Sequence, residues 1–325
     1  MFGLAHNRAR APDHASCSGC GLCLLVCPAW RRSRDIGLTP LARARALQLG
    51  AGAADIADSI HSCTLCGACE PVCPEDIGLV AMTLDLRRQL PLPDAAAGLR
   101  APMGEPRPIA AQASGKTILL PDPALRARSA TLARAAALLG GAIAADDGAD
   151  IALALESGSA IPAPRLERFL APLRAAQRVV VADGLLLRQL RQWLPGANSV
   201  GIGTALSALP AVRRALRASD LYVIEPRAYH ADYQRLVKYY DALRAAAGSA
   251  FNLDLQRIAV PAAARSLPQR LGLEASDDRI QTEWILQGRS IERVVVESLE
   301  DAAAFEQHGA HPVVHLADLA DDGTS

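Results

Sequence analysis

The sequence predicts a multidomain protein with an all-α N-terminal domain and a C-terminal α/β domain that holds a largely parallel sheet. All eight cysteines of the 325-residue chain lie in its first 73 residues. The residues around them carry helix signals and no alternating strand pattern, whereas short apolar runs beyond residue 116 alternate with helical stretches. We therefore expect domains at residues 1–90 and 116–325, joined by a proline-rich linker at residues 91–115.

The cysteines form two copies of the pattern C-x-x-C-x-x-C-x-x-x-C-P. A 4Fe-4S cubane needs four thiolates, and three cysteines at intervals of three let one short loop supply three of them. In two-cluster ferredoxins, the fourth cysteine of each run binds the other cluster. The pattern therefore predicts two 4Fe-4S clusters, with the ligands Cys17, Cys20, Cys23 and Cys73 for cluster 1 and Cys63, Cys66, Cys69 and Cys27 for cluster 2.

Other uses of cysteine fit this pattern poorly. Structural zinc sites use pairs of cysteines or mixed Cys and His ligands, not three evenly spaced cysteines followed by Cys-Pro. Disulfides need an oxidising compartment, and the N-terminal residues MFGLAHNRARAPDH contain no apolar core of a secretion signal. No Cys-x-x-Cys pair is followed by histidine, as covalent haem attachment requires.

Three helices are expected in the cysteine-containing domain. The first begins at Pro40, with Thr39 as its N-cap, and stops at Gly50. A second, shorter helix over residues 53–62 leads into the second motif, and a third over residues 79–90 follows it. The cysteine loops should therefore lie between short helices instead of strands.

Two segments, CSGCGLCLLVCPAW at residues 17–30 and SCTLCGACEPVCPEDIGL at residues 62–79, resemble the α-helical ferredoxin domain. This domain occurs in the ferredoxin-type iron–sulfur subunits of heterodisulfide reductase and of anaerobic glycerol-3-phosphate dehydrogenase, in the lactate-oxidation iron–sulfur proteins and, more distantly, in the succinate dehydrogenase iron–sulfur subunit. The resemblance implies a subunit of a multi-subunit oxidoreductase. Its implied partners are a flavoprotein dehydrogenase, a heterodisulfide-reductase-like complex or a quinone-reactive membrane subunit.

Seven apolar runs in the C-terminal domain are expected to be strands. Their alternation with helical stretches rich in Ala, Leu and Arg predicts a largely parallel sheet flanked by helices. The runs are Thr117–Leu120, Ile151–Ala154, Val179–Val181, Leu221–Ile224, Ile258–Val260, Val294–Val296 and Val313–His315.

In relatives of the helical ferredoxin, the fused or partner domain is often of the cysteine-rich CCG type, whose thiolates bind a cluster or zinc for disulfide chemistry. The C-terminal domain of this chain has the same position and the same α/β rhythm, but it contains no cysteine. We therefore expect a docking domain or a degenerate CCG-like domain. Direct disulfide reduction by this chain is disfavoured.

One polar segment of the C-terminal domain is a candidate catalytic site. It directly follows the expected strand Leu221–Ile224, and open α/β sheets bind their ligands at the carboxyl ends of strands. Ordinary loop chemistry with an internal ion pair is the simpler interpretation. The candidate residues are Glu225, Arg227, Tyr229, His230 and Asp232.

Three further groups of residues could suggest a function, but a structural role explains each of them more simply. Arg31, Arg32 and Arg34 follow the first cysteine motif and could offset cluster charge or bind a partner, but such charge runs usually form a solvated face. Gly201 and Gly203 lack the third glycine of a dinucleotide-binding motif, so a tight turn is expected. Three histidines show no carboxylate pattern of a metal site and are expected to be surface or core residues: His308, His311 and His315.

The charge balance argues against nucleic acid as a partner, and the hydropathy argues against a membrane-spanning segment. With 34 basic and 34 acidic side chains, the chain offers no basic surface for a nucleic-acid backbone. No run approaches the roughly 20 apolar residues that cross a bilayer, so the chain itself should not span a membrane. A cytoplasmic location is expected, with any contact to the inner face of the membrane made through partners.

These observations favour an electron-transfer subunit. It would relay electrons through two 4Fe-4S clusters between a dehydrogenase-type partner and a quinone-linked or heterodisulfide-reductase-like acceptor. The alternative is an iron–sulfur enzyme with its own substrate site in the C-terminal α/β domain. A third interpretation makes the clusters a structural scaffold only.

Overall fold

The computed structural model describes residues 14–91, 116–255, 257–308 and 311–321. Residues 92–115 of the expected linker lie outside the described residues. Within the described ranges, none of the helices combines the length and the apolar composition that a bilayer span requires.

The N-terminal region is helical, and residues 14–91 contain no strand. The all-α character expected for the N-terminal region is therefore confirmed. The helices of the region are η1 (His14–Ser16), α1 (Leu22–Leu25), α2 (Pro28–Ser33), η2 (Ile36–Leu38), α3 (Pro40–Gln48), η3 (Ala54–Ile56), α4 (Ala57–Ser62) and α5 (Leu79–Gln89).

The ends of these helices follow from the sequence. The side chain of Thr39 caps α3 by accepting a hydrogen bond from the Ala42 amide at 3.3 Å, and Pro40 occupies the first helical position. The helix expected over residues 53–62 is divided into the 3-10 turn η3 and α4. Each cysteine loop is thereby fixed by helix ends on both sides.

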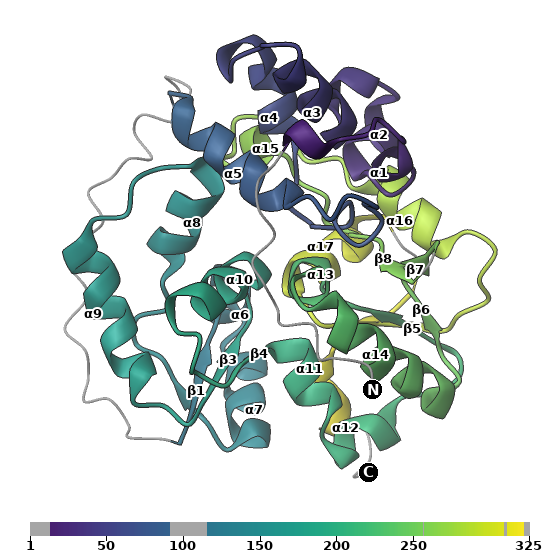
Figure 1. The fold of residues 1–325 in the computed structure, drawn as a ribbon. Coiled ribbons are helices and arrows are strands. Elements are labelled where there is room, and N and C mark those ends of the chain that lie inside the picture. The colour runs from purple at the N-terminus through teal and green to yellow at the C-terminus, as the bar shows by residue number, and fades with distance from the viewer. Residues whose placement is uncertain (1–13, 92–115, 256, 309–310, 322–325) are drawn as a thin grey trace, which may run out of the picture.

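The C-terminal region contains two parallel sheets of four strands, each at the centre of a lobe (Figure 1). Lobe A has the strand order β2 (Ala142–Ile143), β1 (Thr117–Leu120), β3 (Arg178–Val181) and β4 (Ser199–Gly201), and all neighbours are parallel. Its helices are α6 (Pro123–Ala127), α7 (Ser129–Leu139), α8 (Ala149–Ser157), α9 (Ala163–Arg174), α10 (Gly184–Trp193), α11 (Ile202–Ser207) and α12 (Pro210–Ala215).

Lobe B has the strand order β10 (Val313–His315), β9 (Arg293–Val296), β5 (Asp220–Val223) and β6 (Ala250–Phe251), again with parallel neighbours. A short antiparallel ribbon, β7 (Leu253–Asp254) and β8 (Ile258–Ala259), lies beside it. The helices of lobe B are α13 (Pro226–Ala231), α14 (Tyr233–Ala247), α15 (Leu267–Arg270), α16 (Arg279–Leu286) and α17 (Leu299–His308), followed by η5 (Leu316–Asp321) after β10.

The parallel α/β fold is confirmed, with two sheets in place of one. The strand predicted at Ile151–Ala154 is wrong, because these residues lie in helix α8. Gly148 and Gly158, at φ of 69° and 74°, bound this helix in the left-handed region, and its buried residues recur with helical spacing. The predicted strand Ile258–Val260 belongs to the antiparallel ribbon. Strands of two or three residues, such as β2 and β4, are too short to give a sequence pattern.

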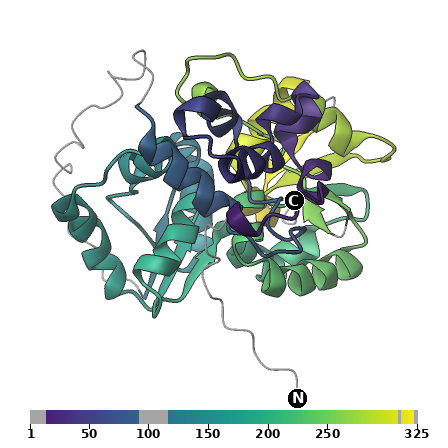
Figure 2. The same ribbon diagram turned by 45° about the horizontal axis from the view of Figure 1, so that its top comes forward.

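The two lobes share a hydrophobic core and a common cover. Leu119 and Val180 of lobe A belong to the same buried cluster as Tyr222 and Val295 of lobe B. The N-terminal helices lie across one end of both lobes (Figures 1 and 2). There α5 contacts α8 of lobe A, whereas α2 and α4 contact α16 and α15 of lobe B. The helical region therefore bridges the lobes.

The arginines after the first cysteine motif take part in this contact, so the solvated face expected for them is wrong for Arg31 and Arg32. The guanidinium of Arg31 donates to Gln281 at 3.1 Å and to Asp254 at 3.3 Å, and it lies 4.5 Å from the ring centroid of Trp284. Arg32 donates to a backbone carbonyl of lobe B at 3.1 Å. Their positive charges hold the helical region on lobe B.

Candidate iron–sulfur centre

The two cysteine loops together line two cavities, and each cavity receives three cysteines from one motif and the fourth from the other. Cys17, Cys20, Cys23 and Cys73 line the first cavity, and Cys27, Cys63, Cys66 and Cys69 line the second. Pro40 and Leu79, at the starts of α3 and α5, line both. The two cavities are therefore adjacent.

Glycines shape both loops. Gly19 and Gly21 have φ of 78° and 77°, a left-handed backbone that allows the first loop to turn back between its cysteines. Gly67 of the second loop has φ of 75°, and a Cβ at this position would lie 3.1 Å from the Cβ of His230. The second loop therefore packs directly on helix α13 of lobe B.

The cavities differ in exposure. Cys20 in the first cavity is exposed to solvent. Cys27 and Cys66 in the second cavity are each 8 % exposed. Lobe B covers this second cavity in part through His230, whose Nδ1 donates a hydrogen bond to the carbonyl oxygen of Cys66 at 2.7 Å. The first cavity therefore faces solvent, and the second faces the interior.

Burial and mutual repulsion raise the pKa of the cysteine thiols. Burial, followed by repulsion from the neighbouring cysteines, raises the pKa of Cys23 to about 12. Burial also raises the pKa of Cys66 to about 11 and increases the pKa of Cys27 and Cys69. Thiolates packed in this way need a bound cation to offset their charge.

The donors fit an iron–sulfur cluster better than a single metal ion. Four cysteines line each cavity, joined in the first by the carboxylate residue Glu75, and thiolates are the ligands of 4Fe-4S clusters. Among the residues that the structure describes, no three His, Cys, Asp or Glu side chains are grouped closely enough to hold one ion. A 4Fe-4S cubane takes four thiolates, the number of cysteines that line each cavity.

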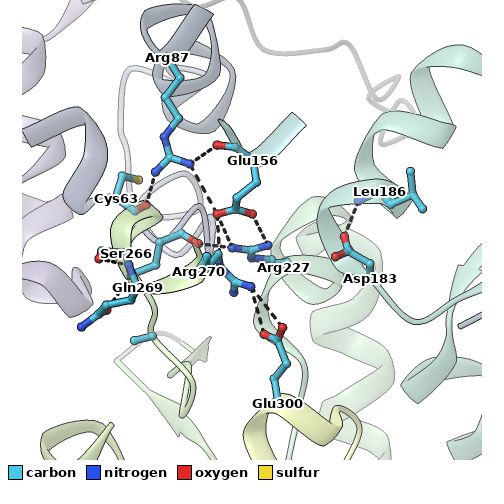
Figure 3. Close-up of polar contacts among 12 residues, drawn as sticks. Cys63, Arg87, Glu156, Asp183, Leu186, Arg227, Ser266, Gln269, Arg270 and Glu300 are labelled. Atoms are coloured by element: carbon cyan, nitrogen blue, oxygen red, sulfur yellow. Dashed lines mark hydrogen bonds and ion pairs between the residues drawn. The ribbon is translucent and has the colours of Figure 1, made fainter. Parts of the chain in front are cut away.

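Two buried arginines lie beside the second cavity. Arg43 lines the cavity, is 1 % exposed and donates to the carbonyl oxygen of Ser59 at 2.6 Å. Arg87 donates to the carbonyl oxygens of Cys63 at 2.5 Å and of Glu156 at 2.6 Å (Figure 3). Sequence patterns could not identify them, because single arginines do not stand out in so arginine-rich a chain. They place positive charge where the thiolates gather.

Glu156 of lobe A connects this charge to both lobes (Figure 3). Its carboxylate accepts hydrogen bonds from Arg227 at 2.8 and 3.1 Å, and it lies 3.3 Å from Arg270 and 3.5 Å from Arg87. Burial opposes ionisation of this group, but Arg227, Arg270 and Arg87 outweigh it and lower the pKa of Glu156 to about 2. Arg227 also donates to the carbonyl oxygen of Thr64, in the second cysteine loop, at 2.7 Å.

A third cavity lies between the lobes, next to the second cysteine loop. Thr64 and Cys66 line it together with polar residues that follow four parallel strands. The carboxyl ends of such strands are the usual ligand sites of α/β sheets. The residues after β1, β3, β5 and β9 are Asp122, Asp183, Glu225 and Ser298.

Two of the five catalytic candidates line this interlobe cavity. Glu225 caps helix α13, because its carboxylate accepts hydrogen bonds from the amides of Arg227 and Ala228 at 3.0 and 2.6 Å. Burial raises the pKa of Glu225 to about 8. Arg227 lines the cavity too, and its pairing with Glu156 is an internal ion pair of the kind expected in a structural loop.

The other three candidates point elsewhere, because helix α13 turns its successive side chains about its axis. The hydroxyl of Tyr229 donates to the carbonyl oxygen of Arg257 at 2.8 Å. His230 contacts the second cysteine loop, as described above. Asp232 pairs with Arg191 at 3.4 Å. The structure therefore does not gather the five residues at one point.

The weaker motifs have structural roles. A Cβ at Gly203 would lie 2.0 Å from the carboxyl carbon of Glu297, so close packing explains this glycine. Gly201 ends β4 and caps α11, which agrees with the expected turn. His315 is buried, and its Nε2 lies 3.2 Å from the carbonyl oxygen of Glu297. His308 ends α17.

Comparison with known families matches this region. Residues 13–77 match the model of a 4Fe-4S dicluster domain. No curated protein and no solved structure is detectably similar to the chain. Residues 13–77 therefore form a 4Fe-4S dicluster domain, which supports an iron–sulfur electron-transfer protein.

Proposed function

We propose that this chain is the electron-relay subunit of a multi-subunit oxidoreductase and that each cysteine cavity holds one 4Fe-4S cluster. The lining of the cavities supports this proposal: Cys17, Cys20, Cys23 and Cys73 would hold cluster 1, and Cys27, Cys63, Cys66 and Cys69 would hold cluster 2. When bound, such clusters exchange single electrons at potentials that hydrogen bonds and burial adjust.

We expect the two cysteine sites to have different roles in the electron relay, because their surroundings differ. Cys20 is exposed, so the first site is the one that a partner can approach. The second site lies beneath lobe B and beside the buried cations of Arg43 and Arg87, which would offset the negative charge of its four thiolates. We infer that electrons cross the surface of the protein at the first site and reach its interior at the second.

The partner would dock around helix α1. Leu22 and Leu25 of this helix are 42 % and 57 % exposed, and they lie two and five positions after Cys20 in the chain. Redox complexes have small interfaces, and the centre of a protein interface is more apolar than its rim. The resemblance to electron-transfer subunits suggests a flavoprotein dehydrogenase or a quinone-linked membrane subunit as this partner. The α/β region would then be a docking platform, or a degenerate CCG-like domain.

Anaerobic purification from the native host tests the proposal. The protein should contain iron and sulfide for two clusters, and a redox titration followed by electron paramagnetic resonance should show both changing state. Gentle purification should retain a flavin-containing or membrane-bound companion. Clusters that stay in one redox state at all accessible potentials would contradict the relay and favour a structural role.

A second function is supported by the cavity between the lobes. It joins the carboxyl ends of both sheets to the loop of Cys66, so a substrate small enough to enter it would lie beside the second cysteine site and next to Glu225 and Arg227. The chain would then be an iron–sulfur enzyme fed by its own clusters. Turnover of a small substrate by the purified chain with an artificial electron donor would favour this function, whereas redox activity only in the presence of a partner would favour the relay.

A further inference from the structure

All the tyrosines of this aromatic-poor chain gather in one place. The sequence contains five tyrosines, all within residues 222–240, and only 4 % aromatic residues. They come from strand β5 and helices α13 and α14 of lobe B, and each ring lies close to at least one other. The five residues are Tyr222, Tyr229, Tyr233, Tyr239 and Tyr240.

His230 and three of these tyrosines form a continuous series of rings that starts at the second cysteine loop. His230 donates to the carbonyl oxygen of Cys66 at 2.7 Å. The ring centroids of His230 and Tyr229 are 5.2 Å apart, those of Tyr229 and Tyr240 are 5.5 Å apart, and those of Tyr240 and Tyr239 are 5.0 Å apart. Each step is therefore short enough for ring edges to be in contact.

The far end of the series reaches the surface. Tyr239 is partly exposed, and its hydroxyl lies 2.8 Å from the hydroxyl of Ser207. The guanidinium of the exposed residue Arg213 lies 5.6 Å from the ring centroid of Tyr239. Small molecules in solution can therefore reach this last ring, whereas Tyr240 is 1 % exposed.

A buried carboxylate lies beside the middle of the series. The hydroxyls of Tyr240 and Tyr222 both donate to Oε1 of Glu297, at 2.6 and 2.7 Å, and its Oε2 accepts from the amide of Glu225 at 2.9 Å. Burial raises the pKa of Glu297 to about 7, so it is a stronger base than an exposed carboxylate. An apolar residue of similar size would avoid the cost of burying this charge, so packing alone gives no reason for it.

We propose that His230, Tyr229, Tyr240 and Tyr239 carry one-electron oxidising equivalents from the second cysteine cavity to the surface, and so protect that cavity from oxidative damage. This inference rests on the proposed cluster at Cys27, Cys63, Cys66 and Cys69. The oxidant is of the hydroxyl-radical class, which forms when hydrogen peroxide meets ferrous iron.

The charges and atoms of the transfer balance. Tyr240 loses one electron through Tyr229 to the oxidant, and its phenolic proton passes to Oε1 of Glu297. The hydroxyl radical takes up this electron to become hydroxide, and the proton that Tyr239 releases in the last step converts this hydroxide to water. Tyr240 then regains an electron from Tyr239 and its proton from Glu297, while Tyr239 releases its phenolic proton to solvent. A tyrosyl radical remains on Tyr239 until a thiol-class reductant returns a hydrogen atom.

Spin trapping tests this route. Protein whose iron and sulfide content has been measured is treated with hydrogen peroxide at pH 8 and a nitroso spin trap, and mass spectrometry locates the adduct. We expect the adduct on Tyr239 in the wild type, its loss in Tyr240→Phe and in Tyr229→Phe, and its absence from cluster-free protein. Tyr233→Phe is the matched control: this partly exposed ring lies 5.6 Å from Tyr229 and 6.4 Å from His230 but is not one of the steps from Tyr229 to Tyr239, so the adduct on Tyr239 should remain.

Two outcomes would overturn the route. If wild-type protein that contains iron and sulfide forms no adduct on Tyr239, the series does not transfer oxidising equivalents. An equal yield on Tyr239 in both interrupted variants would show direct attack from solvent. In either case the electron relay would stand, since it does not use the tyrosines. A chain that binds neither iron nor sulfide would instead overturn the relay and the tyrosine route together.

Discussion

The guanidinium of Arg227 donates to the carboxylate of Glu156 at 2.8 and 3.1 Å, across the boundary between the lobes. The same guanidinium donates to the carbonyl oxygen of Thr64 in the second cysteine loop at 2.7 Å. One side chain therefore joins lobe B, lobe A and the helical region. Through these contacts, a movement of either lobe would displace the loop that carries Cys63 and Cys66.

Replacing Arg227 by Met should destabilise the protein strongly. The change leaves Glu156 buried with less positive charge around it, and breaking a buried pair in this way costs about 3–5 kcal/mol. The measurement is the midpoint of urea unfolding at equal cluster content. Arg174→Met is the control, because Arg174 pairs with Glu167 on the exposed surface, where little stability is at stake. Equal midpoints for the two variants would contradict the role of Arg227.

Glu297 should make stability depend on pH. Burial raises its pKa to about 7 in the folded protein, against 4.5 for an ordinary glutamate. Between these two pKa values, the folded state keeps a proton on Glu297 that the unfolded state has lost. The stability that this proton contributes is therefore complete below pH 4.5 and is lost as the pH rises through 7. The loss should be on the order of 3 kcal/mol.

Comparison with Glu297→Gln isolates this effect, because glutamine does not titrate and its amide oxygen can still accept from Tyr222 and Tyr240. The groups that face Glu297 are these two hydroxyls and the amide of Glu225. The free energy of unfolding of the variant, relative to the wild type, should rise between pH 5 and pH 8. A difference that stays constant over this range would show that Glu297 titrates normally.

Adding one methyl group at Gly203 should destabilise the contact between the lobes. A Cβ there would lie 2.0 Å from the carboxyl carbon of Glu297, whose position two tyrosine hydroxyls fix. Such overpacking costs about 1–3 kcal/mol. Gly196→Ala is the matched control, since a Cβ at Gly196 meets nothing within 4 Å, and its thermal midpoint should be nearly unchanged. Wild-type stability in Gly203→Ala would refute the close packing.

The sequence indicated the helical and α/β regions and the cysteine motifs, because each depends on local spacing. Ile151–Ala154 was misassigned because a short apolar run fits a buried strand and a buried helix face equally well. Tyr229, His230 and Asp232 followed the right strand, but the helix that begins at Pro226 turns them away from the interlobe cavity.

Long-range contacts were beyond the reach of sequence patterns. The pairing of Glu156 with Arg227 joins residues 71 positions apart, and no local spacing marks either of them. The contact of Arg31 with Gln281 spans 250 positions. Both contacts form only because the helical region lies over both lobes. The features that fix the environment of the cysteine cavities therefore come from the tertiary fold.

The most direct test of the account is the iron and sulfide content of two double variants prepared anaerobically. Cys17→Ala with Cys73→Ala removes two cysteines that line the same cavity, so about half of the wild-type iron and sulfide should remain. Cys17→Ala with Cys27→Ala removes one cysteine from each cavity and should abolish or weaken both clusters. The reverse result, with one intact cluster only in the second variant, would mean that each motif holds its own cluster and would contradict the crossed arrangement.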